Sequence, residues 1–348
     1  MSGPEQEAGA QARRPGPTPV LELVHVKKEF PVRRGLGEVM RGGRSSVHAV
    51  DDVSFKLGRG EILGLVGESG CGKTTLGRIV MRLIAPTSGR ILMDGRDAAE
   101  TGEETETAWR RSVQMIFQDP YASMNPRFRV RDVLEEPLLI HRIGATREAR
   151  LRLIEAVMEK VKMVPVRDYV DRHPHMLSGG QRQRVATARA LILSPRVIVA
   201  DEPVSMIDLS TRAEILHMMK AVQGEMELSF LYITHDISTA RYFAHRIAVM
   251  YLGRIVEIGP ADQIIESPRH PYTRALIQAV CEPVPGRVRR LKELPIEGEI
   301  PSAANIPSGC RFHPRCVFAQ PECAGPAEPG LETVGPGHTA ACRRLKEI

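Results

Sequence analysis

Three short apolar runs stand out from the mostly polar or alternating pattern of this chain. They are residues 62–66 (ILGLV), 197–200 (VIVA) and 230–233 (FLYI). A continuous apolar run of this length is typical of a strand buried on both faces, as in a parallel sheet covered by helices. Each run ends beside residues that carry chemical groups, and ligands of parallel α/β sheets bind beyond the carboxyl ends of the strands. The pattern therefore predicts an α/β core with its functional site along that edge.

Two other segments alternate between apolar and polar positions. Residues 20–26 and 53–57 have the period of half-exposed strands. Residues 33–46, between them, are rich in Gly and Arg and predict a loop. We expect a small antiparallel sheet at the start of the chain.

Residues 125–190 have a helical pattern. One helix is predicted with Thr146 as its N-cap, and the following apolar positions form its buried face: Ala149, Leu153, Ile154, Val157, Met158 and Val161. Residues 1–18 show no apolar period, and the composition shifts toward Pro, Gly and Cys past Pro260. We therefore predict a disordered tail over residues 1–18, a main domain over 19–260 with a helical subdomain at about 125–190, and a C-terminal extension over 261–348.

Composition and charge narrow the class of protein. A chain of 348 residues with 42% hydrophobic content suits one large α/β domain with an appendage. It has no run near the ~20 apolar residues that span a bilayer and no signal-peptide core at its start, which predicts a cytosolic protein. The net charge of +6 is compatible with a nucleic acid partner, with an acidic membrane surface, or with solvated basic faces alone, and we favour the last of these. Only 4% of residues are aromatic, and they do not interleave with the basic ones. We expect no nucleic acid partner.

Residues 67–74 (GESGCGKT) match the P-loop pattern. Its glycines let backbone N–H groups surround phosphates, its lysine reaches the β and γ oxygens, and its hydroxyl binds Mg²⁺. The segment lies between a buried strand and a predicted helix over residues 75–83, which is the expected context of a P-loop. The alternative interpretation is a glycine-rich turn that binds no ligand. The candidate nucleotide-binding residues are Gly67, Ser69, Gly70, Cys71, Gly72, Lys73, Thr74 and Thr75, with Thr74 also a Mg²⁺ ligand.

Two carboxylates come directly after the second buried strand. Asp201 can hold the hydration shell of Mg²⁺, and Glu202 can orient and polarise an attacking water as a general base. The alternative is that both acids only solvate the end of the strand. A P-loop elsewhere in the chain favours the catalytic interpretation.

A second phosphate-binding surface is predicted at residues 177–181 (LSGGQ). A Ser-Gly-Gly turn that opens a helix presents a hydroxyl and free backbone N–H groups to phosphate oxygens. Since a P-loop protein already holds its own nucleotide, this turn would serve a nucleotide held by another chain. ATP would then hold two chains together through Ser178, Gly179, Gly180 and Gln181.

With these motifs, the chain resembles the nucleotide-binding subunits of ABC transporters over roughly residues 20–348. Within that family it looks most like the peptide and nickel importer branch, because of GESGCGKTT at 67–75, FQDPY at 117–121, HPYTR at 270–274 and a cysteine-rich tail. The resemblance implies an α/β P-loop NTPase with a RecA-like parallel sheet core. It also implies an antiparallel β subdomain, a helical signature subdomain and a Cys-rich C-terminal extension.

The resemblance implies further roles for single residues. His235 matches a switch histidine that contacts the γ-phosphate, and Gln118 matches a glutamine that touches Mg²⁺ and water and transmits the nucleotide state. Phe30 stands where the family has an aromatic ring under adenine, although packing alone would also explain it. Asp208 matches a residue that crosses the dimer interface, but residues 205–208 read SMID where most relatives have SALD.

The cysteine pattern leaves several alternatives open. Cys71 lies in the P-loop and Cys281 is isolated, whereas Cys310, Cys316, Cys323 and Cys342 gather in the extension. Disulfides rarely persist in a cytosolic protein, and the paired spacing of zinc sites is absent. Four thiols at irregular spacing are compatible with an iron–sulfur cluster. The resemblance implies a four-iron four-sulfur cluster of structural or regulatory role, with zinc or metal-free cysteines as alternatives.

The function implied by the resemblance is an ATPase that uses ATP and Mg²⁺ to drive import. Its partners would be a second, different ATPase subunit, two membrane permeases and an extracytoplasmic solute-binding protein, with this chain peripheral on the cytoplasmic face of the inner membrane. Peptides are the expected cargo, and the SMID loop favours an oligosaccharide as the alternative. A soluble ABC ATPase that acts on nucleic acid or ribosomes is the alternative from another class.

Overall fold

The computed structural model describes residues 18–31, 46–100, 102–279 and 296–347. Its centre is an eight-stranded sheet in which β9, β3, β8, β7 and β6 run parallel, whereas β10, β12 and β11 continue the sheet in antiparallel pairs. In spatial order the strands are β11 (Glu332–Gly335), β12 (His338–Ala340), β10 (Arg254–Pro260), β9 (Arg246–Tyr251), β3 (Ile62–Val66), β8 (Ser229–Thr234), β7 (Val197–Asp201) and β6 (Val113–Ile116).

The three apolar runs are adjacent central strands of this sheet. Every residue of β3, β7 and β8 is buried. Burial on both faces explains why they lack the alternation of a half-exposed strand. The predicted α/β core is confirmed.

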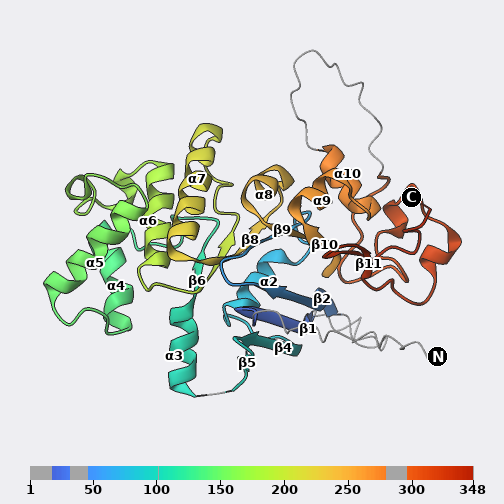
Figure 1. Cartoon of the computed structure of the whole chain (residues 1–348), viewed down its shortest axis with the longest axis horizontal. Coiled ribbons are helices and arrows are strands. Elements are labelled where there is room, and N and C mark those ends of the chain that lie inside the picture. Colours follow the sequence, from blue (N-terminus) through green and yellow to red (C-terminus); the bar gives the residue numbers. More distant parts are fainter. Residues whose placement is uncertain (1–17, 32–45, 101, 280–295, 348) are drawn as a thin grey trace, which may run out of the picture.

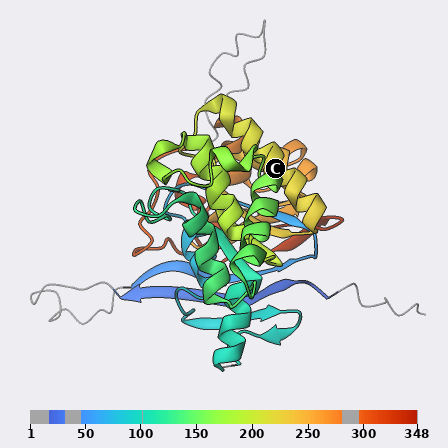
Figure 2. The same ribbon diagram turned by 90° about the vertical axis from the view of Figure 1, so that its left-hand side faces the viewer.

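A second, four-stranded antiparallel sheet lies against the first. Its order is β2 (Ser46–Leu57), β1 (Leu21–Pro31), β4 (Ser88–Met93) and β5 (Arg96–Asp97). Figure 2 shows β1 and β2 (blue) crossing the molecule below the helices drawn in green and yellow. Of the predicted loop at 33–46, residues 33–45 lie outside the described residues and Ser46 begins β2.

Helices cover the main sheet and extend to one side of it. They are α2 (Lys73–Val80), α3 (Glu103–Ser112), α4 (Val130–Ile140), α5 (Arg147–Lys160), α6 (Gly179–Leu191), α7 (Leu209–Met226), α8 (Ile237–Phe243), α9 (Ala261–Glu266) and α10 (Pro271–Ala279). Short 3₁₀ turns in the described residues are η1 (Val166–Asp168), η2 (Pro174–Met176), η3 (His313–Arg315) and η4 (Pro321–Ala324). Helix α2 packs between the two sheets, because Leu76, Ile79 and Val80 share one core with β1 and β3.

Helices α4, α5 and α6 lie together at the left of Figure 1, away from the small sheet. Thr146 caps α5 as predicted, since its hydroxyl accepts a hydrogen bond from the Ala149 N–H at 3.2 Å. Ile154, Val157 and Met158 are buried on the inner face of the helix. Leu153 was predicted on that face, but 38% of its surface is exposed.

The C-terminal segment is joined to the main sheet by backbone pairing. Strand β12 pairs with β10 at Glu257 and Ile258, and β11 pairs with β12. Figure 1 shows this segment (orange to red) at the right, beside β10 and β2. The C-terminal segment is therefore part of the same sheet as β3, the strand that leads into the P-loop.

Among the helices of the described residues, none is long and apolar enough to cross a membrane.

Candidate nucleotide site

The candidate phosphate loop connects β3 to α2, and its glycines are required by close backbone contacts. A Cβ on Gly67 would lie 2.2 Å from the Met250 carbonyl oxygen. Gly72 has a φ of 109°, and its Cβ would lie 2.0 Å from the Ala49 carbonyl oxygen. Only glycine fits these two positions. Helix α2 begins at Lys73, two residues before the predicted helix start.

The loop forms one wall of a cavity of about 660 Å³. From the loop, residues 68–70 and 72–75 line it, and Gln118, Glu202 and His235 line it from the ends of other segments. Val47 and Ala49 of β2 complete the cavity together with Leu276 and Ala303 of the C-terminal segment. The described residues thus bring P-loop and strand-end candidates to one cavity.

Lys73 lies inside the loop. Its side chain is 5% exposed, and its ammonium donates to the carbonyl oxygens of Gly67 at 2.8 Å and Glu68 at 2.9 Å. Cys71 is also buried, 3.8 Å from the same ammonium, and burial raises the pKa of its thiol. The lysine charge therefore lies directly under the loop.

Two side chains that carry oxygen ligands for a metal ion meet beside the first turn of α2. The Thr74 hydroxyl donates to the Asp201 carboxylate at 3.2 Å. Burial raises the pKa of Asp201, and the Thr74 hydrogen bond only partly opposes this. A hydroxyl and a carboxylate are hard oxygen ligands of the kind that Mg²⁺ takes in nucleotide sites, so this donor set fits the ion.

Glu202 is the centre of a hydrogen-bonded group of three side chains. Its carboxylate accepts from Gln118 Nε2 at 3.1 Å and lies 2.9 Å from His235 Nδ1. The backbone of Glu202 has a φ of 46°, a left-handed conformation uncommon for a residue with a side chain. The structure therefore brings together the three candidate catalytic residues.

The predicted signature turn begins helix α6. Ser178 accepts from the Gln181 N–H at 3.3 Å, and the Gln181 side chain accepts from the Ser178 N–H at 3.0 Å. Ser178 and Gly179 are exposed, whereas Gly180 is buried with its Cβ position 2.4 Å from the Thr211 side chain. None of these residues lines the cavity beside the P-loop.

Asp208 also begins a helix. Its carboxylate accepts from the Ser210 hydroxyl at 2.7 Å and from the Thr211 N–H at 3.0 Å, and these bonds lower its pKa to about 2. It is ionised at neutral pH and caps α7.

Phe30 lies near the cavity without lining it. It is 39% exposed and pairs across the small sheet with Val47, which does line the cavity. The Lys28 ammonium lies 5.1 Å from the centre of its ring. This placement leaves one ring face partly covered by a cation.

Several residues of the site were missed in the sequence. Tyr272 accepts a hydrogen bond from the backbone N–H of Glu68 at 2.9 Å, and Arg315 forms an ion pair with the Glu68 carboxylate. Tyr272 lies in the HPYTR segment, which carried no predicted role. Local sequence could not indicate these contacts, because Glu68 and Arg315 are 247 residues apart.

The prediction of an iron–sulfur cluster is wrong. In the ranges that the structure describes, no group of three or more His, Cys, Asp or Glu side chains is placed to hold a metal ion. Cys310, Cys316, Cys323 and Cys342 line a cavity of only about 20 Å³, together with Phe312 and other residues. Burial raises the pKa of Cys310 to about 12 and also raises those of Cys316 and Cys342. Buried thiols of this kind pack as small apolar groups.

Comparison with known families gives two matches along the chain. The family described as ABC transporter matches residues 50–205, and the family described as Oligopeptide/dipeptide transporter, C-terminal region, matches residues 256–323. The first range contains the P-loop, Gln118 and Glu202, whereas His235 lies beyond its end. The second contains Tyr272, Arg315 and three of the four clustered cysteines.

Two curated relatives align with this chain over almost the whole length of both proteins. The oligopeptide transport ATP-binding protein AppF of Bacillus subtilis (strain 168) is 44% identical over 327 residues, which cover 93% of this chain and 96% of AppF. The dipeptide transport ATP-binding protein DppF of Haemophilus influenzae is 44% identical over 325 residues, with the same coverage.

Among solved structures, the ATP-binding cassette MJ0796 is similar in a dimeric post-hydrolysis state bound to ADP and phosphate. The TM-score is 0.60 at 27% identity, and the match covers 69% of this chain and 98% of the cassette.

Proposed function

Since the chain belongs to the ATP-binding subunits of ABC transporters, in the oligopeptide and dipeptide branch, we propose that it energises the import of peptides. Its enzymatic activity is the hydrolysis of ATP, with Mg²⁺ as the accompanying ion. Peptides are the proposed cargo because AppF and DppF, its relatives along the whole chain, are peptide transport proteins by name.

The observation that carries the proposal is the Glu202 group beside the phosphate loop. Gln118 and His235 hold the two carboxylate oxygens of Glu202, and all three residues line the cavity. A carboxylate held in this way can orient a water molecule and accept its proton, which is the role of a general base. We assign the proton-accepting role to Glu202 and positioning roles to Gln118 and His235.

The phosphate loop would hold the nucleotide by its backbone N–H groups and by Lys73, and Thr74 and Asp201 would hold Mg²⁺. When bound there, the ion would supply positive charge that neutralises the charge developing on the phosphate groups. Lys73 donates to two loop carbonyl groups in this structure, so binding a triphosphate requires its ammonium to exchange these partners for phosphate oxygens. Val47 and Ala49 would form the wall beside the base, with Phe30 at its margin.

The signature turn would serve a nucleotide held by another subunit. Ser178 and Gly179 are exposed and lie outside the cavity of their own chain. The Ser178 oxygen already accepts from Gln181, but its hydroxyl hydrogen remains available to a phosphate oxygen. The proposed dimer would therefore place two ATP molecules between P-loop and signature turn, with Asp208 at the interface.

These assignments are consistent with a proposed division of the chain into domains. We propose a cassette over residues 19–260, a helical subdomain at about 125–190 that presents the signature turn, and a C-terminal extension over 261–348. The predicted tail at 1–18 lies almost wholly outside the described residues. The partners would be a second, different ATPase subunit, two permeases and an extracytoplasmic solute-binding protein, with this chain on the cytoplasmic face of the inner membrane.

Uptake by the assembled transporter tests the proposal. The chain would be purified with its permease and ATPase partners, placed in lipid vesicles and supplied with a binding protein, labelled di- and oligopeptides, and ATP. ATP-dependent peptide uptake that a Lys73→Ala variant lacks would support the proposal. Uptake of oligosaccharides but not peptides would overturn the cargo, and co-purification with ribosomes instead of membrane proteins would overturn the class.

A further inference from the structure

The phosphate loop carries a carboxylate of its own. Glu68 is the second residue of the loop and lines the nucleotide cavity. Most of the other groups that the loop presents there are backbone N–H groups and the Lys73 ammonium, which attract phosphate. An unpaired carboxylate at this position would repel a triphosphate, so its pairing matters for binding.

Arg315 of turn η3 neutralises this carboxylate. Its two terminal nitrogens donate to the two Glu68 oxygens at 2.8 and 3.0 Å, the bidentate geometry of a strong arginine–carboxylate pair. The Arg315 side chain is 7% exposed and the Glu68 side chain 24% exposed. Burial alone would lower the pKa of Arg315, but the hydrogen bonds and charge interactions with Glu68 and Tyr251 together outweigh burial and raise the pKa. Arg315 therefore stays charged.

A second residue of the C-terminal segment fixes the backbone of the same loop residue. The Tyr272 hydroxyl accepts from the Glu68 N–H at 2.9 Å, and Tyr272 is fully buried. Its ring packs against Tyr251 and Phe312 at 4.6 and 5.4 Å between ring centres. The side chain and the backbone of Glu68 are thus both held by residues outside the cassette.

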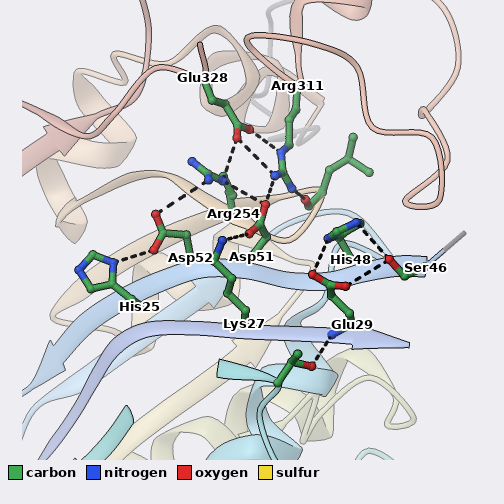
Figure 3. A network of polar contacts seen from close by, with 12 residues as sticks. His25, Lys27, Glu29, Ser46, His48, Asp51, Asp52, Arg254, Arg311 and Glu328 are labelled. Atoms are coloured by element: carbon green, nitrogen blue, oxygen red, sulfur yellow. Dashed lines mark hydrogen bonds and ion pairs between the residues drawn. The ribbon is translucent and has the colours of Figure 1, made fainter. Parts of the chain in front are cut away.

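Four residues before Arg315, Arg311 anchors the segment to the small sheet. It forms ion pairs with Asp51 of β2 and with Glu328, and it donates to the Leu252 carbonyl oxygen. Figure 3 shows Arg311 and Arg254 between Asp51 and Glu328, with Lys27 and Asp52 at the edge of the network. The segment is therefore fixed on both sides of the nucleotide cavity, at β2 and at the phosphate loop.

We propose that Arg315 is a positioning residue for ATP. It neutralises the Glu68 carboxylate, and with Tyr272, which holds the Glu68 backbone, it lets the C-terminal segment support ATP binding at the phosphate loop. The inference rests on the proposed ATP site. It implies that any displacement of the segment from Glu68 lowers affinity for ATP. The loss of affinity should grow with the charge of the nucleotide, because it comes from repulsion between the Glu68 carboxylate and the phosphate groups.

Nucleotide titrations of the full-length chain test this, with ATP, ADP and AMP as probes. Arg315→Gln is expected to raise the Kd for ATP on the order of tenfold. The Kd for ADP should rise less, and the Kd for AMP should rise least. Arg315→Gln combined with Glu68→Gln should recover ATP binding to within about threefold of Glu68→Gln alone, since no charge is then left unpaired. Arg344→Gln is the matched control, because Arg344 also belongs to the C-terminal segment but pairs with Glu347.

The outcomes separate this inference from the proposed function. If the unchanged protein binds no ATP, the ATP site itself fails. If it binds ATP and Arg315→Gln binds within twofold of it, the positioning role is refuted. An equal loss for ATP and AMP, or a loss that Glu68→Gln does not reverse, would show that Arg315 acts only in folding, and that too would overturn the proposal.

Discussion

Replacing Glu202 by Gln removes one negative charge and one proton acceptor from the candidate site and keeps the size of the side chain. In the structure, both carboxylate oxygens are used, one by Gln118 Nε2 at 3.1 Å and one near His235 Nδ1 at 2.9 Å. The amide can keep its oxygen toward Gln118 and turn its NH₂ toward His235. The fold should therefore tolerate the change.

The size of the effect follows from the role assigned to the carboxylate. Loss of a positioned general base slows a reaction by roughly 10²–10⁴, which is about 3–5 kcal/mol of activation free energy. ATP binding should persist, because the Glu202 carboxylate is held by Gln118 and His235 and its removal takes a negative charge away from the phosphates. ATP-bound dimers should therefore accumulate.

Two measurements check this prediction on the purified transporter complex. Phosphate release gives the rate of hydrolysis, and gel filtration with and without ATP gives the association of the ATPase subunits. Glu214→Gln is the control, because Glu214 is a mostly exposed carboxylate that pairs with Arg184. Hydrolysis by Glu202→Gln within threefold of the unchanged protein would refute the role of Glu202.

Three further predictions concern other parts of the site. Lys73→Ala should weaken ATP binding measured by calorimetry, because it removes the charge under the phosphate loop, and unchanged binding would contradict the P-loop assignment. Ser178→Arg should leave the chain's own ATP binding intact but reduce ATP-dependent dimerisation in gel filtration, and normal dimerisation would sink the two-chain site. Asp51→Asn should cost on the order of 1–2 kcal/mol in urea unfolding at pH 7. Burial alone would raise the pKa of Asp51, but its hydrogen bonds with Arg311 and Lys27, together with the charges of Arg311 and Arg254, lower it from 3.8 to about 2. This stability is therefore complete above about pH 4 and is lost as the pH falls toward 2, where both proteins should unfold alike.

The sheet core could be predicted because its signals are local. Burial on both faces makes β3, β7 and β8 continuously apolar, and the carboxyl ends of these parallel strands meet at one edge of the sheet. That rule led to Glu202 and His235, which do meet in the structure. Helix caps are equally local, and Thr146 could be identified for this reason.

The contacts of the C-terminal segment could not be predicted in this way. The pairing of β12 with β10 and the ion pair of Arg315 with Glu68 depend on where a long chain returns, which no periodicity records. The cysteines misled for a related reason: their number and spacing suggested a metal, but spacing does not determine where the thiols point or how deeply they are buried. Among the described residues, the structure places no three of these side chains so that they could hold a metal ion together.

The two family matches divide the chain into regions that the structure joins again. One match ends at residue 205 and the other begins at 256, yet Arg311 reaches Asp51 and Arg315 reaches Glu68 across that division. Ala303 adds to this, since its carbonyl oxygen accepts from the His48 N–H while the residue lines the nucleotide cavity. A likeness to MJ0796 covers only 69% of this chain, so a cassette can reach this fold within a much shorter chain. The C-terminal segment is therefore not needed to form a phosphate loop. In this chain, however, the phosphate loop carries the Glu68 carboxylate, and Arg315 of the C-terminal segment is needed to neutralise that charge.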